Sequence, residues 1–189
     1  FFENKLTPVQ IAQIGQYAEN VYFGKPCGLM DQMASSVGGM VYIDFADSRE
    51  PKVLKLDVDL AKYGYGICII DSGADHADLT DEYAAIPGEL SELCRCFGRD
   101  YLREISKENF IKKIPELRGK VSDRAILRAF HIYQENDRVE QQVEALRWDD
   151  IDAFLELVNE SGNSSWMYLQ NITPTGAVDH QEMAVALAL

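Results

Sequence analysis

The sequence predicts an α+β fold, because strand-like and helix-like patterns occupy different parts of the chain. Apolar and polar residues alternate over residues 53–60, which is the period of a half-buried strand. Residues 65–70 are apolar on both faces and predict a central, buried strand. After Thr80 the apolar residues follow helical spacing. With a further strand over residues 40–45, we expect at least three strands and then a mostly helical second half.

The first third of the chain carries clear signals for helix starts and stops. Thr7 is expected to cap a helix with Pro8 at its first position, and Gln10 completes a capping box. A short helix is expected over residues 30–37, where a Gly-Gly pair ends it.

The second half is expected to contain a series of capped helices. One helix, or two, is expected over residues 81–97, with Pro87 forcing a break or a kink. The expected N-caps of the later helices are Ser106, Ser122 and Asp149, and the expected stops are Pro115 and Gly162.

The organisation of the chain suggests two domains. The short break between Leu60 and Tyr65 predicts a boundary, with one domain over residues 1–62 and another over residues 63–189. The chain begins at Phe1 without Met and stops within an apolar helical pattern. We therefore expect it to be part of a longer protein.

Charge and hydropathy exclude several classes of function. The net charge is -13 and the sequence pI is near 4.6, which argues against nucleic acids and anionic membranes as partners. A locally basic pocket for a phosphorylated substrate stays compatible with this charge. No apolar run approaches the roughly 20 residues of a membrane span, and no signal peptide is present.

The four cysteines do not form a recognisable metal motif. Only Cys94 and Cys96 are close in sequence, and no His lies within five residues of them, so a closed zinc site is not expected. Reduced thiols in a cytoplasmic protein are the favoured interpretation.

Residues 26–32, Pro-Cys-Gly-Leu-Met-Asp-Gln, are the most informative stretch of the sequence. Gly28 lets a ligand approach the backbone closely. Asp31 stands at an expected helix start, where it is either a cap or first-turn acid or a carboxylate that serves as a base in a pocket. Spacing alone does not choose between these roles.

Residues 24–45 closely resemble the galactokinase segment that follows the ATP-binding loop in the GHMP kinase superfamily. The resemblance implies that Asp31 is the catalytic base and contacts the substrate, and that Gly28 lines the sugar site. It also implies the GHMP fold: the remainder of an N-terminal α+β domain, then a C-terminal ferredoxin-like domain.

A second match covers residues 71–83, where galactokinases have a buried strand, a loop with a His and a Glu-Tyr pair. The resemblance implies that Tyr83 binds the sugar; otherwise Tyr83 would be a helix residue packed on the core. His76 is assigned a structural role. The basic residues that usually follow Glu-Tyr are replaced here by Ala84-Ala85-Ile86-Pro87.

A third match lies on the expected long helix, where Arg128, His131, Glu135 and Arg138 resemble a family pattern. We expect these residues to be structural, with their charged heads on a solvated face. The later stretch around Ser161 matches less well, because Gly162 replaces a family His.

By resemblance, the complete protein would transfer a phosphoryl group from ATP, with Mg²⁺, to the C1 hydroxyl of galactose. No Gly-rich phosphate loop occurs in the 189 residues, so ATP and metal ligands are expected elsewhere and the chain alone is expected to be inactive. The alternatives are a GHMP kinase for another substrate, such as N-acetylgalactosamine or a small alcohol, and a non-catalytic sugar sensor. The sequence does not indicate an oligomeric state.

Overall fold

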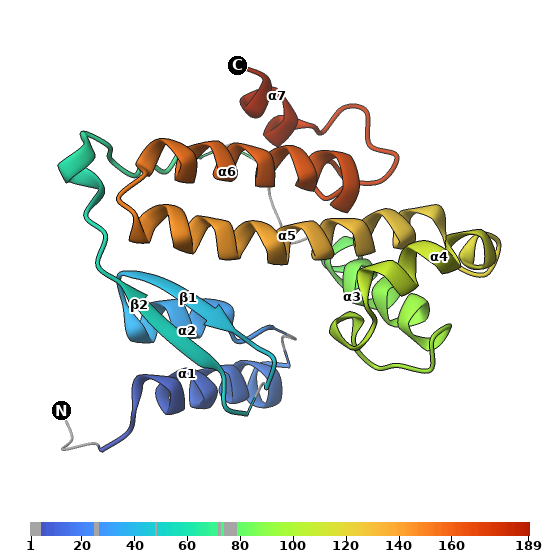
Figure 1. The fold of residues 1–189 in the computed structure, drawn as a ribbon, viewed down its shortest axis with the longest axis horizontal. Coiled ribbons are helices and arrows are strands. Elements are labelled where there is room, and N and C mark those ends of the chain that lie inside the picture. The colour runs from blue at the N-terminus through green and yellow to red at the C-terminus, as the bar shows by residue number, and fades with distance from the viewer. Residues whose placement is uncertain (1–4, 25–26, 48, 72, 74–78) are drawn as a thin grey trace. The chain divides into compact units, whose positions relative to one another are not determined.

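The computed structural model describes residues 5–24, 27–47, 49–71, 73 and 79–189 (Figure 1). The chain divides into two compact units, Phe1–Gly66 and Ile67–Leu189, and each is described here by itself. The assignment of residues 1–62 and 63–189 to the two GHMP domains stays a prediction.

The first unit is a pair of helices with a β-hairpin. Its elements are α1 (Pro8–Tyr17), a π-helical turn (Ala18–Tyr22), α2 (Met30–Val37), β1 (Met40–Asp44), β2 (Lys52–Leu56) and a 3-10 turn (Leu60–Tyr63). The predicted capping box is confirmed: the Thr7 side chain accepts from the Gln10 amide, and the Gln10 side chain accepts from the Thr7 amide. The hairpin is antiparallel, with Met40 opposite Leu56. The small core of the first unit forms around Ala12, Leu29 and Met33.

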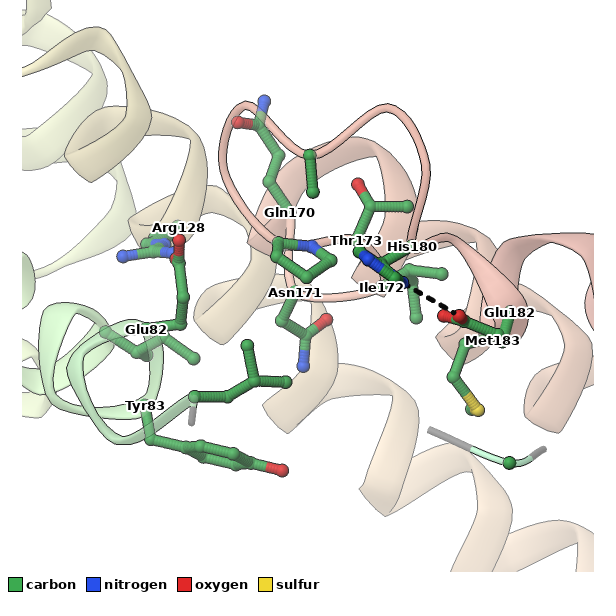
Figure 2. Close-up of a pocket in the computed structure, with 15 residues that line it drawn as sticks. Glu82, Tyr83, Arg128, Gln170, Asn171, Ile172, Thr173, His180, Glu182 and Met183 are labelled. Atoms are coloured by element: carbon green, nitrogen blue, oxygen red, sulfur yellow. Dashed lines mark hydrogen bonds and ion pairs between the residues drawn. The ribbon is translucent and has the colours of Figure 1, made fainter. Parts of the chain in front are cut away.

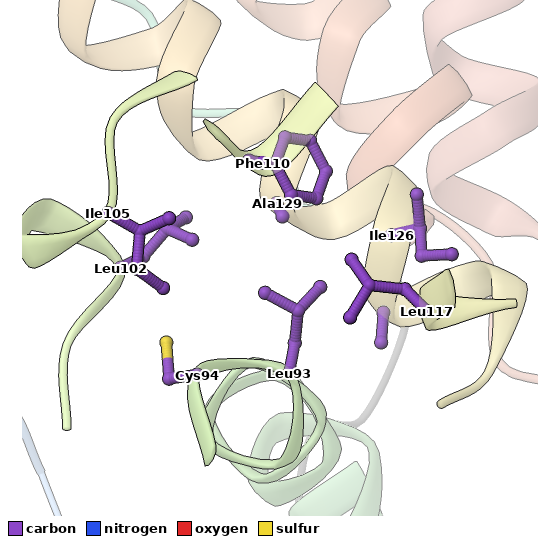
Figure 3. Packing of buried hydrophobic residues seen from close by; sticks show 9 residues of the cluster. Leu93, Cys94, Leu102, Ile105, Phe110, Leu117, Ile126 and Ala129 are labelled. Atoms are coloured by element: carbon purple, nitrogen blue, oxygen red, sulfur yellow. The ribbon is translucent and has the colours of Figure 1, made fainter. Parts of the chain in front are cut away.

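The second unit is helical in the part of the chain that the structure describes. Its elements are α3 (Thr80–Arg95), a 3-10 turn (Leu102–Glu104), α4 (Lys107–Leu117), α5 (Asp123–Arg147), α6 (Ile151–Ser164), a π-helical turn (Ser165–Leu169) and α7 (Glu182–Ala188). Helices α5 and α6 form an antiparallel hairpin (Figure 1). Figure 3 shows how Leu93 of α3, Phe110 of α4 and Ala129 of α5 meet in the core. The Phe110 ring lies 5.0 Å from that of Phe130, in an edge-to-face arrangement.

The α+β class is confirmed, but the strand predicted over residues 65–70 is wrong for the described structure. This segment has no regular secondary structure, and Ile67, Ile69 and Ile70 are 82%, 97% and 85% exposed. A strand needs a neighbour to satisfy its backbone groups, and the described residues place none beside it. The strand predicted over residues 53–60 is also shorter than expected, ending at Leu56.

Several predicted helix ends are wrong. Helix α4 runs through Pro115 to Leu117. Helix α3 is one helix that contains Pro87, which is one of the two alternatives expected for that segment. Asp150, not Asp149, caps α6, because Asp149 adopts a left-handed conformation with φ 61°. Gly162 lies inside α6, which ends at Ser164. The predicted caps Ser106 and Ser122 are confirmed, since each side chain accepts an amide hydrogen bond from its helix.

Candidate functional site

The loop before α2 is held in place by side chains from the preceding helical segment. The Asn20 side-chain amide hydrogen-bonds to both backbone groups of Cys27: it accepts from the N–H at 2.8 Å and donates to the carbonyl at 3.4 Å. Gln16 donates to the same carbonyl at 3.2 Å. The backbone just before Gly28 is therefore fixed by three hydrogen bonds from α1 and its π-helical extension.

Helix α2 turns one face to the core and presents the other to solvent. Leu29 and Met33 are buried against α1, whereas Met30 is 61% exposed and Asp31 is exposed. Leu29 therefore anchors the helix and does not screen Asp31 from water. Asp31 is the second residue of α2, where the partial positive charge of the helix N-terminus favours a carboxylate.

Asp31 is a first-turn acid but not a cap. The N-cap position is Leu29, which offers no side-chain hydrogen bond. Within the described residues, no hydrogen bond or ion pair engages the Asp31 carboxylate, which leaves both oxygens available to a ligand.

Neither backbone conformation nor local packing requires a glycine at position 28. Its φ lies outside the left-handed region, and a Cβ built there would meet no described atom within 4 Å. Space is therefore open beside the backbone three residues before Asp31, where a ligand could approach closely.

Tyr83 lies in the other unit, in the first turns of α3, and lines a pocket of about 560 Å³ (Figure 2). Its side chain is 61% exposed, so it does not pack into the core. The opposite walls come from the segment after α6 and from the start of α7, including Asn171, His180 and Met183. The polar groups of these opposite walls therefore come from segments far from Tyr83 in the sequence.

A hydrogen-bond network joins the start of α3 to the segment after α6. Glu82 accepts from the Thr175 backbone N–H at 2.9 Å and from its hydroxyl at 3.1 Å, and these bonds lower the pKa of Glu82. Arg124 of α5 donates to the Thr175 hydroxyl at 2.9 Å and to Glu89 of α3 at 2.9 and 2.5 Å.

The expectation that Arg128 has a solvated head is wrong. Its side chain is 1% exposed, its Nε donates to the Leu169 carbonyl at 3.0 Å, and its Nη1 lies 3.0 Å from Glu89 Oε2. The contact with Glu89 is close, but its alignment is outside hydrogen-bond geometry, so it acts mainly through charge. Burial lowers the pKa of Arg128, and Glu89 opposes that shift.

His131 and Arg138 are also buried, at 5% and 7% exposure. His131 Nδ1 lies 2.9 Å from Ser164 Oγ, and burial lowers the pKa of His131. Arg138 pairs with Glu135, which accepts from Ser161 at 2.6 Å. These contacts join α5 to α6, so the residues of the third match are structural but not solvated.

The predicted site residues fall into two groups. Gly28 and Asp31 lie together at one loop–helix junction in the first unit, and Tyr83 belongs to the second unit. His76 lies outside the described residues. Thr175 and Asn171 could not be identified from the sequence, because only the fold brings them near α3.

Neither a metal-binding cluster nor a membrane-spanning helix occurs in the part of the chain that the structure describes. Among residues 5–24, 27–47, 49–71, 73 and 79–189, no group of three or more His, Cys, Asp and Glu side chains is arranged to hold a metal ion. No helix in that part of the chain has the length and apolar character needed to cross a membrane.

Known proteins are similar to this sequence. Residues 1–39 match the family model described as the GHMP kinases N terminal domain. Over 159 residues the chain is 36% identical to a galactokinase of Actinobacillus pleuropneumoniae, a match that covers 84% of this chain and 40% of that protein. The chain is a homologue of the galactokinases. A galactokinase of Thermotoga neapolitana is 32% identical over 160 residues, covering 84% of this chain and 43% of that protein.

The fold is similar to that of a solved galactokinase. The structure of Lactococcus lactis galactokinase complexed with galactose matches with a TM-score of 0.70 and 24% identity, covering 92% of this chain and 44% of that one. This galactokinase homologue therefore has the GHMP kinase fold. It spans about 40% of the length of the curated relatives it matches.

Proposed function

We propose that the galactokinase-length protein containing this chain phosphorylates the C1 hydroxyl of galactose with ATP as the phosphoryl donor. The junction of Gly28 and Asp31 carries the proposal. An exposed carboxylate without a described partner stands three residues from open backbone space, on a loop fixed by Asn20 and Gln16. This junction lies within the residues that match the GHMP kinase model.

Asp31 would act as the general base. A sugar hydroxyl becomes a good nucleophile as its proton leaves, and a carboxylate within hydrogen-bond reach takes that proton. The oxygen–phosphorus bond to the sugar forms while the bond from the γ-phosphorus to the bridging oxygen of ATP breaks. The products are sugar 1-phosphate and ADP, and the proton is left on Asp31.

Gly28 and Tyr83 would hold the sugar. Gly28 leaves room for the ring beside the backbone, and the Tyr83 hydroxyl offers one hydrogen bond from the wall of its pocket. That pocket carries the carboxylates of Glu82 and Glu182, while the charge of its one arginine, Arg128, is opposed by Glu89. Such walls suit a neutral polyhydroxyl ligand better than a phosphate.

ATP would supply the phosphoryl group, and Mg²⁺ would neutralise its developing charge. The chain has no Gly-rich phosphate loop, and its described residues include no metal cluster. We therefore assign nucleotide and metal contacts to parts of the protein outside these 189 residues and derive no step from them. No disulfide joins Cys27, Cys68, Cys94 and Cys96, which all lie among the described residues, and this suits the reducing cytoplasm, where we place the protein.

The test is a kinase assay of the galactokinase-length protein against a panel of free sugars, with galactose expected to be the preferred acceptor. If N-acetylgalactosamine or a small alcohol is the preferred acceptor, the proposed substrate is wrong and that compound takes its place. If the protein binds sugar but does not phosphorylate it, the proposed kinase activity is wrong and the protein is a sugar sensor.

Gly28→Ala tests the same site at one position. The variant should fold normally, because its backbone is ordinary and the space around it is open. If a sugar fills that space, the added methyl overpacks the complex, which costs about 1–3 kcal/mol, or roughly a 5- to 150-fold loss in kcat/KM for sugar. Gly162→Ala, at an equally open site inside α6, is the matched control and should leave kinetics unchanged. Equal kinetics for the two variants would remove Gly28 from the site.

A further inference from the structure

The first turns of α3, which carry Tyr83, are weakly held by the helix itself. The N-cap is Leu79, which provides no side-chain hydrogen bond to the exposed amides of the first turn. Pro87 has no N–H and so cannot donate to the Tyr83 carbonyl four residues earlier. An anchor from outside the helix is therefore needed to order this end.

Thr175 supplies that anchor. Glu82, the third residue of α3, occupies the position from which a capping-box acid would reach back to the N-cap. Its two carboxylate oxygens instead accept from the backbone N–H and the hydroxyl of Thr175. The Thr175 hydroxyl also accepts from Arg124, which ties the contact to α5.

The segment that carries Thr175 is itself attached to the helical core. Leu169, at the end of the π-helical turn, accepts from the buried Arg128 at 3.0 Å, and Gln170 then turns the chain with φ 56°. Thr175 therefore approaches α3 from a segment that α5 holds through both Arg128 and Arg124.

We propose that Thr175 is a positioning residue for the sugar site: it fixes the start of α3 and thereby the orientation of Tyr83. The kinetic part of this inference rests on the proposed function, in which Tyr83 binds sugar. The structural part, that Thr175 orders the start of α3, does not.

Amide hydrogen exchange on the 189-residue chain tests the structural part. Thr175→Val keeps the shape but removes the hydroxyl, and the amides of residues 83–86, which donate to the carbonyls of the first turn, should exchange roughly 2- to 13-fold faster, the effect of about one net hydrogen bond. Glu82→Ala should do the same from the other side of the contact, and Thr175→Ser should restore slow exchange. Val178→Thr is the control: it adds a hydroxyl at an exposed position of the same segment and should leave the exchange of these amides unchanged. Unchanged exchange in both Thr175→Val and Glu82→Ala would overturn the inference.

Steady-state kinetics of the galactokinase-length protein test the consequence for sugar. Thr175→Val should raise the KM for sugar by up to the same roughly 2- to 13-fold, with the KM for ATP unchanged and Thr175→Ser close to wild type. Combining Thr175→Val with Glu82→Ala should cost less than the sum of the two changes, because both remove the hydrogen bond from the Thr175 hydroxyl to Glu82. If Tyr83→Phe raises the sugar KM and Thr175→Val does not, the positioning role is wrong and the proposed function stands. If the wild type phosphorylates no sugar, the proposed function fails, and hydrogen exchange alone decides on the anchor.

Discussion

The ion pairs of Glu89 predict a large loss of stability when its charge is removed. Glu89 is 16% exposed and compensates two arginines, Arg124 at 28% exposure and Arg128 at 1%. Glu89→Gln keeps the size of the side chain but leaves the buried Arg128 charge without its counter-charge. Breaking a buried pair in this way costs about 3–5 kcal/mol. We expect the lower end, about 3 kcal/mol, because Arg124 can regain water and the amide oxygen still accepts.

Urea unfolding of the 189-residue chain measures this loss. Both tryptophans, Trp148 and Trp166, lie in the second unit, so their fluorescence reports on the unit that contains Glu89. Glu144→Gln is the matched control, since its pair with Arg147 is 57% and 52% exposed and such pairs contribute about 0–1 kcal/mol. A Glu89→Gln variant that loses no more stability than Glu144→Gln would show that the buried network is not the strong contact the geometry indicates.

Two further predictions concern pH and sugar binding. Burial lowers the pKa of His131 in the folded state, so as the pH falls the unfolded chain takes up a proton on His131 before the folded chain does. The contribution of His131 to the free energy of unfolding should therefore be complete above the unfolded pKa of about 6.5 and should decrease as the pH falls below that value. His131→Gln should flatten that slope in urea titrations between pH 7 and 5.5, and an unchanged slope would assign the effect to other groups. Tyr83→Phe in the galactokinase-length protein should raise the sugar KM by roughly 2- to 13-fold, the value of one net hydrogen bond, with the KM for ATP unchanged. A change in the KM for ATP alone would contradict a sugar contact.

Features set by neighbouring residues could be predicted from the sequence. The capping box of α1 and the caps Ser106 and Ser122 depend on residues within one helical turn, and the structure has all three. Pro115 was wrongly expected to end its helix, because a proline removes only one helical hydrogen bond. The same holds for Pro87 in α3. The carbonyls deprived of a donor belong to Tyr83 and Ile111, which are 61% and 47% exposed, so water can replace the missing partner.

Features that depend on distant partners were not predictable in the same way. The apolar pattern of residues 65–70 describes a strand, but pairing depends on a neighbour that the pattern does not identify. Arg128 was interpreted as solvated because it is charged, although its spacing of three residues from the buried Ala125 places the two on the same side of α5. Its partner Glu89 lies 39 positions earlier in the sequence, and only the packing of α3 on α5 brings the two together. The contact of Thr175 with Glu82 spans 93 positions.

The role of Asp31 is the central claim, and one substitution tests it most directly. Asp152 of α6 is the matched control, since it too is an exposed acid at the second position of a helix. In the galactokinase-length protein, Asp31→Asn and Asp152→Asn should each change stability by only about 0.3–1 kcal/mol, the value of a first-turn charge. Turnover should fall about 10²- to 10⁴-fold in Asp31→Asn, the contribution of a general base, and stay normal in Asp152→Asn. A well-folded Asp31→Asn enzyme with the turnover of Asp152→Asn would contradict the proposed mechanism.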